Sequence, residues 1–576
     1  MPGERRQRAC LRPCGVLSFL VHFQEVRPAG LIMARAPSLI ALTKHEIKQI
    51  QTSDKDLEML ALCLRDDPKK RNCEMPGRES ASGAKGVALL KNIFTRLISL
   101  SDRFERRRGP FLAILFLGVA VPACLFYTYI VPPGQVADET AHALRVHALS
   151  HGVVFGHRAS TVHISGQEFI GSGIKGDPAL YHMGFIILRG EVISRNQLLS
   201  LPLTPWTGEK KFYEIGPIAT YLPHFYLPSA ALVALARPVV DSPYGVFIIG
   251  RLGSLLAFVT LGAAALTVAR RGHLVLLCTL CVPMTLSLAG SLNQDGVIIA
   301  TSVLGAALLT RQDPSRPALH QGAWWGAGAA FLAVALAKPP YFPLLALLLL
   351  PWPGLVRQEL TRRLLVIAGG CALAIGWAIL AQGTMGGQII HPPAVLPNPA
   401  GGPDLVYPGP NPKEQARYLL AHPALILTLP WKTLLADATI PLTMIGVLGW
   451  LQVLMPTWYY GFCYGALAVA MVGDSCREAV KRIAWAEAAL ALLVLFACIE
   501  GIYLSQYLVW THLHYPSVQG PQGRYLLPLL PLTLFLLPAL REGRRGWPFL
   551  ALAPVAAAVL GLVAAPLAVV TAFYAR

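Results

Sequence analysis

The sequence predicts an all-α, polytopic helical membrane protein with about eleven spans, and its composition and apolar patterning carry that prediction. Of its 576 residues, 54% are hydrophobic and only 14% are charged, whereas soluble domains average about 45–50% and roughly 25%. The mean hydropathy is +0.51. Apolar stretches approach the roughly 20 residues that a helix needs to cross a bilayer. A soluble enzyme, a disordered chain and a disulfide-rich secreted module are therefore excluded.

The charges divide the chain into two parts. Residues 1–108 contain 21 Lys and Arg and 12 Asp and Glu, and they end in a cluster of arginines, Arg103, Arg106, Arg107 and Arg108. We predict a basic cytoplasmic extension over 1–108, which is either attracted to anionic lipid or, as we favour, poorly ordered. Residues 109–576 form the predicted membrane domain. The remaining basic residues orient its spans, so the net charge of +18 does not require nucleic acid as a partner.

The first predicted span is 111–130, and the arginines before it place the N-terminus in the cytoplasm by the positive-inside rule. The further spans are predicted near 246–269, 273–292, 296–310, 323–337, 340–355, 363–381, 456–473, 484–507, 524–541 and 547–573. This topology puts 13 basic residues on cytoplasmic turns, whereas segment 132–245 has 8 basic and 8 acidic residues. Segments 132–245 and 383–430 are therefore predicted to be external loops.

Two apolar segments do not fit full spans. Residues 218–240 contain Pro223 and Pro228, at which we expect the helix to break, and counting this segment as a span would turn the following arginines outward. Residues 424–455 are interrupted in the same way by Pro430, Asp437 and Pro441. Both segments are predicted to be re-entrant or interfacial helices.

Ionisable residues near the spans are few, and they mark the candidate site. A charge at the centre of a bilayer costs on the order of 2.5–3.5 kcal/mol on insertion scales, so such residues are the first place to look for function. The predicted topology places Asp295, Lys338 and Arg524 at the external ends of their spans. Asp138 and Glu139 lie in the external loop on the same side. We therefore expect an outward-facing polar cavity.

The start of the first external loop carries the densest set of polar groups. Residues 138–150 have helix-forming composition, and they place Asp138, His142 and Arg145 on neighbouring turns. These groups suit a metal site, acid–base chemistry or phosphate binding. The alternative is local, with Asp138 as the N-cap, Glu139 favoured by the helix dipole and His142 on a wet face. The spacing alone does not separate the two interpretations.

The other candidates each have a structural alternative. Asp295 opens a span and fits a helix cap, and Lys338 fits either a snorkelling side chain or a phosphate ligand. Tyr221 suits an aromatic belt as well as a substrate groove. Arg524 has the stronger claim to phosphate, because it lies further inside its span and a guanidinium binds phosphate through two hydrogen bonds.

The order of short motifs resembles that of a bacterial family of multi-pass proteins classed as a domain of unknown function. The resemblance runs from about 110 to 545. It rests on Pro132-Pro133…Asp138-Glu139-Xaa-Xaa-His142, Tyr221-Leu-Pro223, Ser291-Leu-Asn293-Gln-Asp295, Ala337-Lys338-Xaa-Xaa-Tyr341, Gly449-Trp450-Leu451…Pro456 and Gln522-Gly523-Arg524-Tyr525-Leu-Leu-Pro528.

That family in turn resembles the C-type glycosyltransferases (GT-C fold), which take a sugar from a polyprenyl-phosphate donor on the external face and invert its anomeric configuration. The resemblance implies that Asp138 is the catalytic carboxylate, Glu139 a second acidic ligand or positioner, and Asp295 an acid that orients the acceptor or a divalent metal. Lys338 and Arg524 would hold the lipid phosphate. The further predicted substrate-binding residues are His142, Arg145, Tyr221, Asn293, Tyr341, Gln522 and Tyr525.

Two classes of function follow from these observations. The first is a glycosyltransferase of the bacterial cytoplasmic membrane that modifies an envelope glycan, lipid or protein. The second is non-catalytic, either a transporter or flippase for lipid-linked saccharides or an assembly factor. Transporters usually carry internal repeats with paired broken helices, and the sequence has no convincing repeat. The partners predicted are membrane lipid and a polyprenyl-phosphate-linked sugar, with metal dependence and oligomeric state left open.

Overall fold

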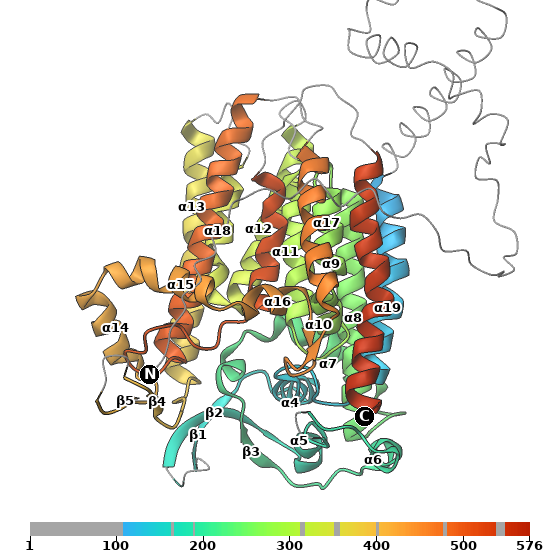
Figure 1. Cartoon of the computed structure of the whole chain (residues 1–576), viewed down its shortest axis with the longest axis vertical. Helices are drawn as coiled ribbons and strands as arrows, with labels where there is room; N and C mark the ends of the chain where they lie inside the picture. The colour runs from blue at the N-terminus through green and yellow to red at the C-terminus, as the bar shows by residue number, and fades with distance from the viewer. Residues whose placement is uncertain are drawn as a thin grey trace, which may run out of the picture. The chain divides into compact units, whose positions relative to one another are not determined.

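The computed structural model describes residues 108–575, except 163–165, 167, 188–189, 312–316, 351–356, 399–401, 476–480 and 537–547. The predicted N-terminal extension, up to residue 107, lies outside the described residues. The described part is mostly helical, as predicted. Long helices stand side by side, and the short helices and strands between residues 139 and 214 gather at one end of them (Figure 1).

Five helices are long and apolar enough to cross a membrane. They are Arg108–Ile130, α8 (Pro243–Val268), α13 (Arg357–Thr384), the Trp485–Val509 part of α18 (Lys481–Val509), and α19 (Leu552–Tyr574). A sixth candidate is the pair α14 (Pro412–Ala421) and α15 (Ala424–Ala436), which is bent by 109°. Helices suit these apolar segments because they satisfy their backbone hydrogen bonds internally.

The remaining apolar segments form shorter elements between the long helices. These are α9 (His273–Cys281), α10 (Pro283–Ala289), α11 (Asp295–Leu309), α12 (Pro317–Ala337), α17 (Thr457–Ser475), and the 3₁₀ helices η4 (Pro339–Leu349) and η5 (Gly523–Phe535). Pro528 and Pro531 lie inside η5 and have no N–H to donate. The 13 residues of η5 reach about 26 Å at roughly 2.0 Å per residue, close to the roughly 30 Å of a bilayer core.

The interrupted segments are folded back, but only some of the expected prolines break them. Residues 216–236 form η2 (Gly216–Thr220), η3 (Pro223–Tyr226) and α7 (Leu227–Ala236). Pro228 lies in the first turn of α7, where no N–H is needed, so the expected break there is wrong. Similarly, α15 continues through Pro430 and ends at Asp437. It is followed by α16 (Thr439–Ile445) and the hairpin of β6 (Val447–Leu448) and β7 (Val453–Leu454).

The first external loop contains the predicted helix and an unpredicted sheet. Helix α4 is Glu139–Ser150, and it is followed by the antiparallel sheet β1 (His157–Val162), β2 (Glu168–Gly176) and β3 (Lys211–Glu214). In the register, Gly173 of β2 lies opposite His157 and Glu214. Two short helices, α5 (Pro178–Met183) and α6 (Arg195–Ser200), lie between β2 and β3. The glycines of β2 weaken its strand signal in the sequence.

The two predicted external loops contact each other. The Gln388 N–H donates to the Ile170 carbonyl at 2.8 Å, and the Ser172 hydroxyl donates to the Met385 carbonyl at 2.7 Å. Strand β2 is thereby joined to the end of α13. The short hairpin of β4 (Ala394–Leu396) and β5 (Leu405–Tyr407) follows on the same side (Figure 1). The loops thus form one layer over the ends of the helices.

Candidate functional site

A tight turn connects the first long helix to α4. The Gln135 N–H donates to the Pro132 carbonyl at 3.2 Å, and Gly134 has a φ of +73°. A Cβ at Gly134 would lie 2.0 Å from the Gly184 carbonyl oxygen, so only glycine fits there. The Trp450 indole donates to the Gly134 carbonyl at 2.5 Å. The Gly449-Trp450-Leu451 motif therefore supports this turn rather than lining a site itself.

Asp138 stands at the N-cap position of α4 without capping it. Its backbone is left-handed (φ 65°, ψ 4°), which is sparsely populated for a residue other than glycine and has to be held by the surroundings. The carboxylate makes no cap hydrogen bond. It accepts instead from the Arg524 guanidinium, which is 386 residues away in the chain. The alternative prediction, that Asp138 is the N-cap of this helix, is therefore correct for its position but not for its side chain.

Four charged side chains form one connected series at this end of the helices. Arg524 pairs with Asp138, its Nε lies 3.9 Å from Asp295 Oδ2, and Lys338 Nζ lies 2.5 Å from Asp295 Oδ1. Asp295 opens α11, Lys338 follows α12, and Arg524 lies at the start of η5. The sequence-predicted acids and cations are therefore brought together, with alternating signs and no net charge.

The four side chains differ in their access to solvent. The side chain of Asp138 is 40% exposed, that of Lys338 is 15% exposed, and those of Asp295 and Arg524 are almost fully buried. An incoming molecule therefore reaches the carboxylate of Asp138 first and the ammonium of Lys338 second. Asp295 serves as the shared counter-ion behind them.

Aromatic residues surround the cations. Lys338 Nζ lies 5.0 Å and the Arg524 guanidinium carbon 5.4 Å from the centre of the Tyr525 ring, within cation–π range. The buried Tyr341 hydroxyl donates to the Tyr525 carbonyl at 2.7 Å. Burial, together with Tyr525 and the two acids, raises the pKa of Tyr221, which closes η2 near the cluster. Three of the predicted tyrosines are thus associated with the charged series.

Burial and the charged series together set the protonation states in the loop. Burial alone would raise the pKa of Asp138, but Arg524 and His142 outweigh it and hold this pKa below its ordinary value. Burial lowers the pKa of His142 to about 4, against the opposing effect of Asp138 and Asp295. The His142 Nδ1 lies 2.7 Å from the Tyr226 hydroxyl. At neutral pH the site therefore contains a carboxylate at Asp138 and a neutral imidazole at His142.

Glu139 is in a different environment from its neighbour. Arg251 of α8 binds it through two hydrogen bonds, Nε to Oε1 at 2.7 Å and Nη2 to Oε2 at 2.6 Å, and both side chains are buried. Glu139 also accepts the N–H groups of Gly134 and Leu292 at 3.1 Å. Arg251 donates further to the carbonyls of Thr128, Val131 and Pro132. These contacts hold the backbone on both sides of the site and leave little of Glu139 free for a substrate.

Some amide side chains around the acids make hydrogen bonds, and others do not. Asn293 donates to the Ala137 carbonyl at 3.2 Å and accepts the Asp295 N–H at 2.9 Å, so it links the two acidic segments. By contrast, both amide atoms of Gln294 and the Oε1 of Gln522 are buried with no hydrogen-bond partner in the part of the chain that the structure describes. Buried polar atoms of this kind are unusual. They offer one amide nitrogen as a donor and two amide oxygens as acceptors to a bound molecule.

Arg145 is buried away from the charged series. Its Nη2 donates to the Val154 carbonyl at 2.7 Å and to the Tyr221 carbonyl at 3.3 Å. Its Nε and Nη1 have no partner among the described residues. Arg145 therefore fixes η2 and the segment after α4. Its contacts place it behind Tyr221, not beside Asp138.

The described residues contain no group of three or more His, Cys, Asp or Glu side chains that is arranged to hold a metal ion. Each acid of the charged series already contacts a cation. Any divalent ion would have to compete with Lys338 and Arg524 for the same carboxylate oxygens.

Two residues that shape the site, Arg251 and Tyr226, were not among the predicted site residues. Arg251 lies within the predicted span 246–269, and a charge inside a span requires a buried partner. The need for a buried partner could therefore have pointed to the pairing of Arg251 with an acid such as Glu139. Tyr226, the partner of His142, lies in an apolar run and shows no comparable signal.

Comparison with protein families matches the family described as "Predicted membrane protein (DUF2142)" over residues 115–533. The chain belongs to this family. The matched region begins in the first long helix and ends in η5, so it includes all four residues of the charged series. The predicted membership of a membrane family of unknown function is thereby confirmed. No curated protein and no solved structure shows significant similarity to the chain.

Proposed function

We propose that this protein is an inverting glycosyltransferase that moves a sugar from a polyprenyl-phosphate donor to an envelope glycan, lipid or protein. The observation that supports it best is the series Asp138–Arg524–Asp295–Lys338 at one end of the apolar helices. It combines one accessible carboxylate with two cations in a protein that lies in lipid. A lipid-linked phosphate and an activated hydroxyl need these groups.

In this proposal, the cations bind the phosphate of the donor. The guanidinium of Arg524 and the ammonium of Lys338 approach the phosphate oxygens, and the polyprenyl chain extends into the membrane along the helices. Binding of the phosphate draws Arg524 away from Asp138. The pKa of Asp138 then rises from its lowered value, because its main opposing charge is shared with the phosphate.

The transfer step follows from these positions. Asp138 accepts the proton of the acceptor hydroxyl as its oxygen attacks the anomeric carbon of the sugar. A new carbon–oxygen bond forms on the face opposite the phosphate, and the bond between the anomeric carbon and the phosphate oxygen breaks. The electron pair leaves with the phosphate, where Arg524 and Lys338 stabilise the added negative charge. Asp295 keeps both cations in place throughout.

The acceptor has a suitable surface in the layer formed by the two loops. A hollow there is lined by Ser172, Thr220, Gln382 and Gln388, among other residues. It lies beside η2, which ends at Tyr221. Hydroxyl and amide side chains of this kind recognise sugars and other polar acceptors by hydrogen bonds.

The arrangement of charges also supports the expected orientation. The site lies at the ends of Arg108–Ile130 and α12 and at the beginnings of α11 and η5. The arginines at 270 and 271 follow the far end of α8, and 357 opens α13 at the same far side. By the positive-inside rule this side is cytoplasmic. We place the site on the external face of a bacterial cytoplasmic membrane, with a cytoplasmic N-terminus and about eleven spans in a GT-C-like fold.

A transporter for lipid-linked saccharides is the competing proposal. It requires polar groups along a path through the membrane, often at paired broken helices. The connected series of four charges is confined to one end of the helices. This confinement favours chemistry at a membrane surface over translocation.

The proposal is tested with the full chain in lipid nanodiscs. A panel of undecaprenyl-phosphate-linked hexoses and pentoses is supplied with envelope extract, and release of undecaprenyl phosphate is measured. We expect release with at least one donor, and a fall of about 10²–10⁴-fold in the Asp138→Asn variant. Glu209→Gln, in an exposed ion pair with Lys211, is the matched control and should act as wild type. No release with any donor, or equal release by the Asp138→Asn variant, would sink the proposal.

A further inference from the structure

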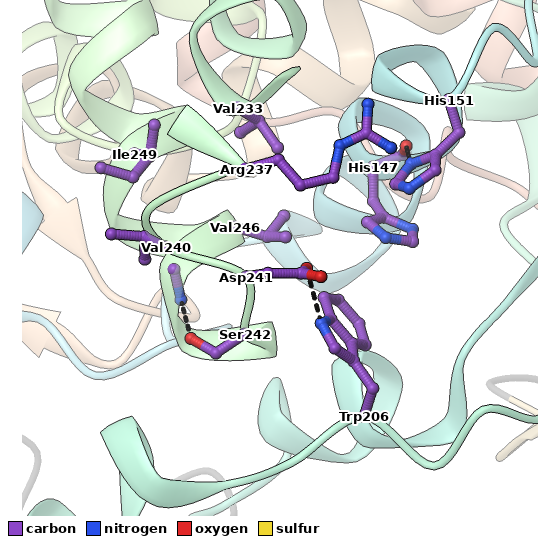
Figure 2. A pocket seen from close by; sticks show the side chains of 11 residues that line it. His147, His151, Trp206, Val233, Arg237, Val240, Asp241, Ser242, Val246 and Ile249 are labelled. Atoms are coloured by element: carbon purple, nitrogen blue, oxygen red, sulfur yellow. Dashed lines mark hydrogen bonds between the residues drawn. The ribbon is translucent and has the colours of Figure 1, made fainter. Parts of the chain in front are cut away.

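A second hollow lies where the loop layer meets the start of α8. Its empty space is about 270 Å³, part of it open to solvent. Figure 2 shows its polar side, with the Arg237 guanidinium beside His147 and His151, and the Asp241 carboxylate beside Trp206. None of these residues belongs to the charged series around Asp138.

The polar side of this hollow presents two opposite charges that do not neutralise each other. The structure has no ion pair between Arg237 and Asp241 among the described residues. Arg237 Nη2 donates to the Ser150 carbonyl at 3.3 Å, which leaves its other guanidinium nitrogens free of protein partners in the described chain. Asp241 Oδ1 accepts the Trp206 indole N–H at 2.8 Å, and its second oxygen stays open.

His147 adds a neutral polar group to this hollow. Burial, and then His151, lowers the pKa of His147 to about 4, so its imidazole is neutral at pH 7. Its ring lies 4.8 Å from that of Trp206 and 4.4 Å from that of His151, measured between centres. Within the described residues, neither ring nitrogen of His147 has a hydrogen-bond partner. The hollow therefore has one cation, one anion and an imidazole, that of His147, whose nitrogens can still form hydrogen bonds.

The other side of the hollow is apolar and leads into the membrane region. Val233, Val246 and Ile249 line it, and the latter two belong to the first two turns of α8, a candidate membrane span. Further along the same face of α8, Leu256 is 54% exposed. Beside the hollow, Leu235 and Val239 are 77% and 87% exposed. An apolar chain that follows this face would have its polar head at the hollow, at the level where the span begins.

We propose that this hollow is a binding site for a phospholipid with a zwitterionic headgroup that carries a primary ammonium, such as phosphatidylethanolamine. The phosphate pairs with Arg237, and the ammonium donates to the open oxygen of Asp241. One acyl chain lies along Val246, Ile249 and Leu256. A headgroup that carries both charges can engage Arg237 and Asp241 together, whereas a purely anionic headgroup would meet Asp241 unfavourably.

This lipid site is separate from the donor site of the proposed transferase. His142 and His147 both belong to α4, but five residues turn a helix by about 140° beyond one full turn, so they face different sides. His142 contacts Tyr226, whereas His147 contacts Trp206. The lipid proposal therefore stands or falls without any assay of sugar transfer.

The test is native mass spectrometry of the full chain released from detergent with equimolar phosphatidylethanolamine, phosphatidylglycerol and phosphatidylcholine. We expect phosphatidylethanolamine to be retained at least tenfold more than phosphatidylglycerol, and phosphatidylcholine, which has no ammonium N–H, to be retained less. Arg237→Gln and Asp241→Asn should each remove that preference. Arg195→Gln, on the exposed start of α6, is the control and should keep it.

Equal retention of the three lipids by the wild-type chain would mean nonspecific annular lipid only and would overturn the proposal, whatever the variants do. A preference that survives in both the Arg237 and the Asp241 variants would also overturn it. Melting temperatures of all variants are measured alongside. Both substituted residues are at least partly exposed, so we expect no large loss of folding.

Discussion

Two neighbouring acids, Asp138 and Glu139, occupy contrasting environments. Glu139 is fully buried, and it is bound by Arg251 and by two backbone N–H groups. Asp138 is 40% exposed, and its one strong partner, Arg524, is shared with Asp295. Both carboxylate oxygens of Glu139 are thus occupied by hydrogen bonds within the protein, whereas the side chain of Asp138 is partly open to solvent. Glu139 therefore holds the structure of the site together, whereas Asp138 is the acid that a bound molecule can reach.

The change of backbone conformation from Asp138 to Glu139 explains why the side chains of these adjacent residues have different partners. Asp138 is left-handed and precedes α4, whereas Glu139 is the first helical residue. This reversal directs the two side chains to separate sets of partners, α8 for Glu139 and η5 for Asp138. The strained backbone at Asp138 is held by the Gly134 turn and by Asn293 on the Ala137 carbonyl.

The largest effect should come from breaking the buried pair. Arg251→Leu leaves Glu139 charged, buried and without its cation, so we expect the free energy of unfolding to fall by about 3–5 kcal/mol. Equilibrium unfolding of the nanodisc-embedded or detergent-solubilised chain measures this. The double variant Glu139→Leu with Arg251→Leu should recover a large part of the loss. An unchanged free energy of unfolding, as expected for loss of the exposed Lys211–Glu209 pair, would contradict a structural role for Arg251.

A smaller effect is expected at the partly open end of the charged series. Lys338→Met removes the close partner of Asp295 but leaves the 3.9 Å contact with Arg524. We expect the free energy of unfolding to fall by about 2 kcal/mol, less than for Arg251→Leu. The same unfolding measurement decides the ranking. If the Lys338 variant were the less stable of the two, the pair of Glu139 and Arg251 would not be the contact on which the fold depends most, contrary to the comparison above.

The smallest effect concerns pH. The pKa of Asp138 is lower in the folded chain than in the unfolded chain, so its contribution to stability is complete above about pH 4, the unfolded value, and is lost as the pH falls through the folded value. Because the side chain is 40% exposed, we expect at most about 1 kcal/mol after solvent screening. Melting of wild type and of the Asp138→Asn variant between pH 7 and pH 3 measures this difference.

A second substitution, at His142, removes the nearest other group that titrates in this pH range. His142, whose pKa is lowered to about 4, also gains a proton in this range. Repeating the comparison with His142→Gln present isolates the carboxylate. An advantage of wild type that grew below pH 4 would have the wrong sign for a lowered pKa at Asp138.

The sequence predicted the long helices and the group of charges because both rest on strong physical constraints. Apolar stretches near 20 residues have few alternatives to a spanning helix, and charges at span ends on one side were expected to meet. Arg524, Asp295 and Lys338 do lie together with Asp138. Which acid pairs with which cation depends on how helices far apart in the sequence pack together. These pairings therefore could not be predicted from the spacing of the residues in the sequence.

The parts that were missed have weak local signals. Strand β2 contains Gly171, Gly173 and Gly176, which lower strand propensity, so its sheet was not expected. Pro228 and Pro430 resemble helix breakers, but one lies in a first turn and the other is accommodated within α15. The division between Asp138 and Glu139 depends on a positive φ at Asp138, and the modest preference of Asp for this conformation is too weak to predict it.

The central claim is that Asp138 performs chemistry while Glu139 supports the fold. The most direct test measures melting temperature and undecaprenyl-phosphate release on the same preparations of the Asp138→Asn and Glu139→Gln variants. We expect Asp138→Asn to lose release by at least about 100-fold at a melting temperature near that of wild type. Glu139→Gln should melt at a lower temperature and keep most of its release per folded molecule. Full release by Asp138→Asn, together with complete loss in a normally stable Glu139→Gln, would contradict it.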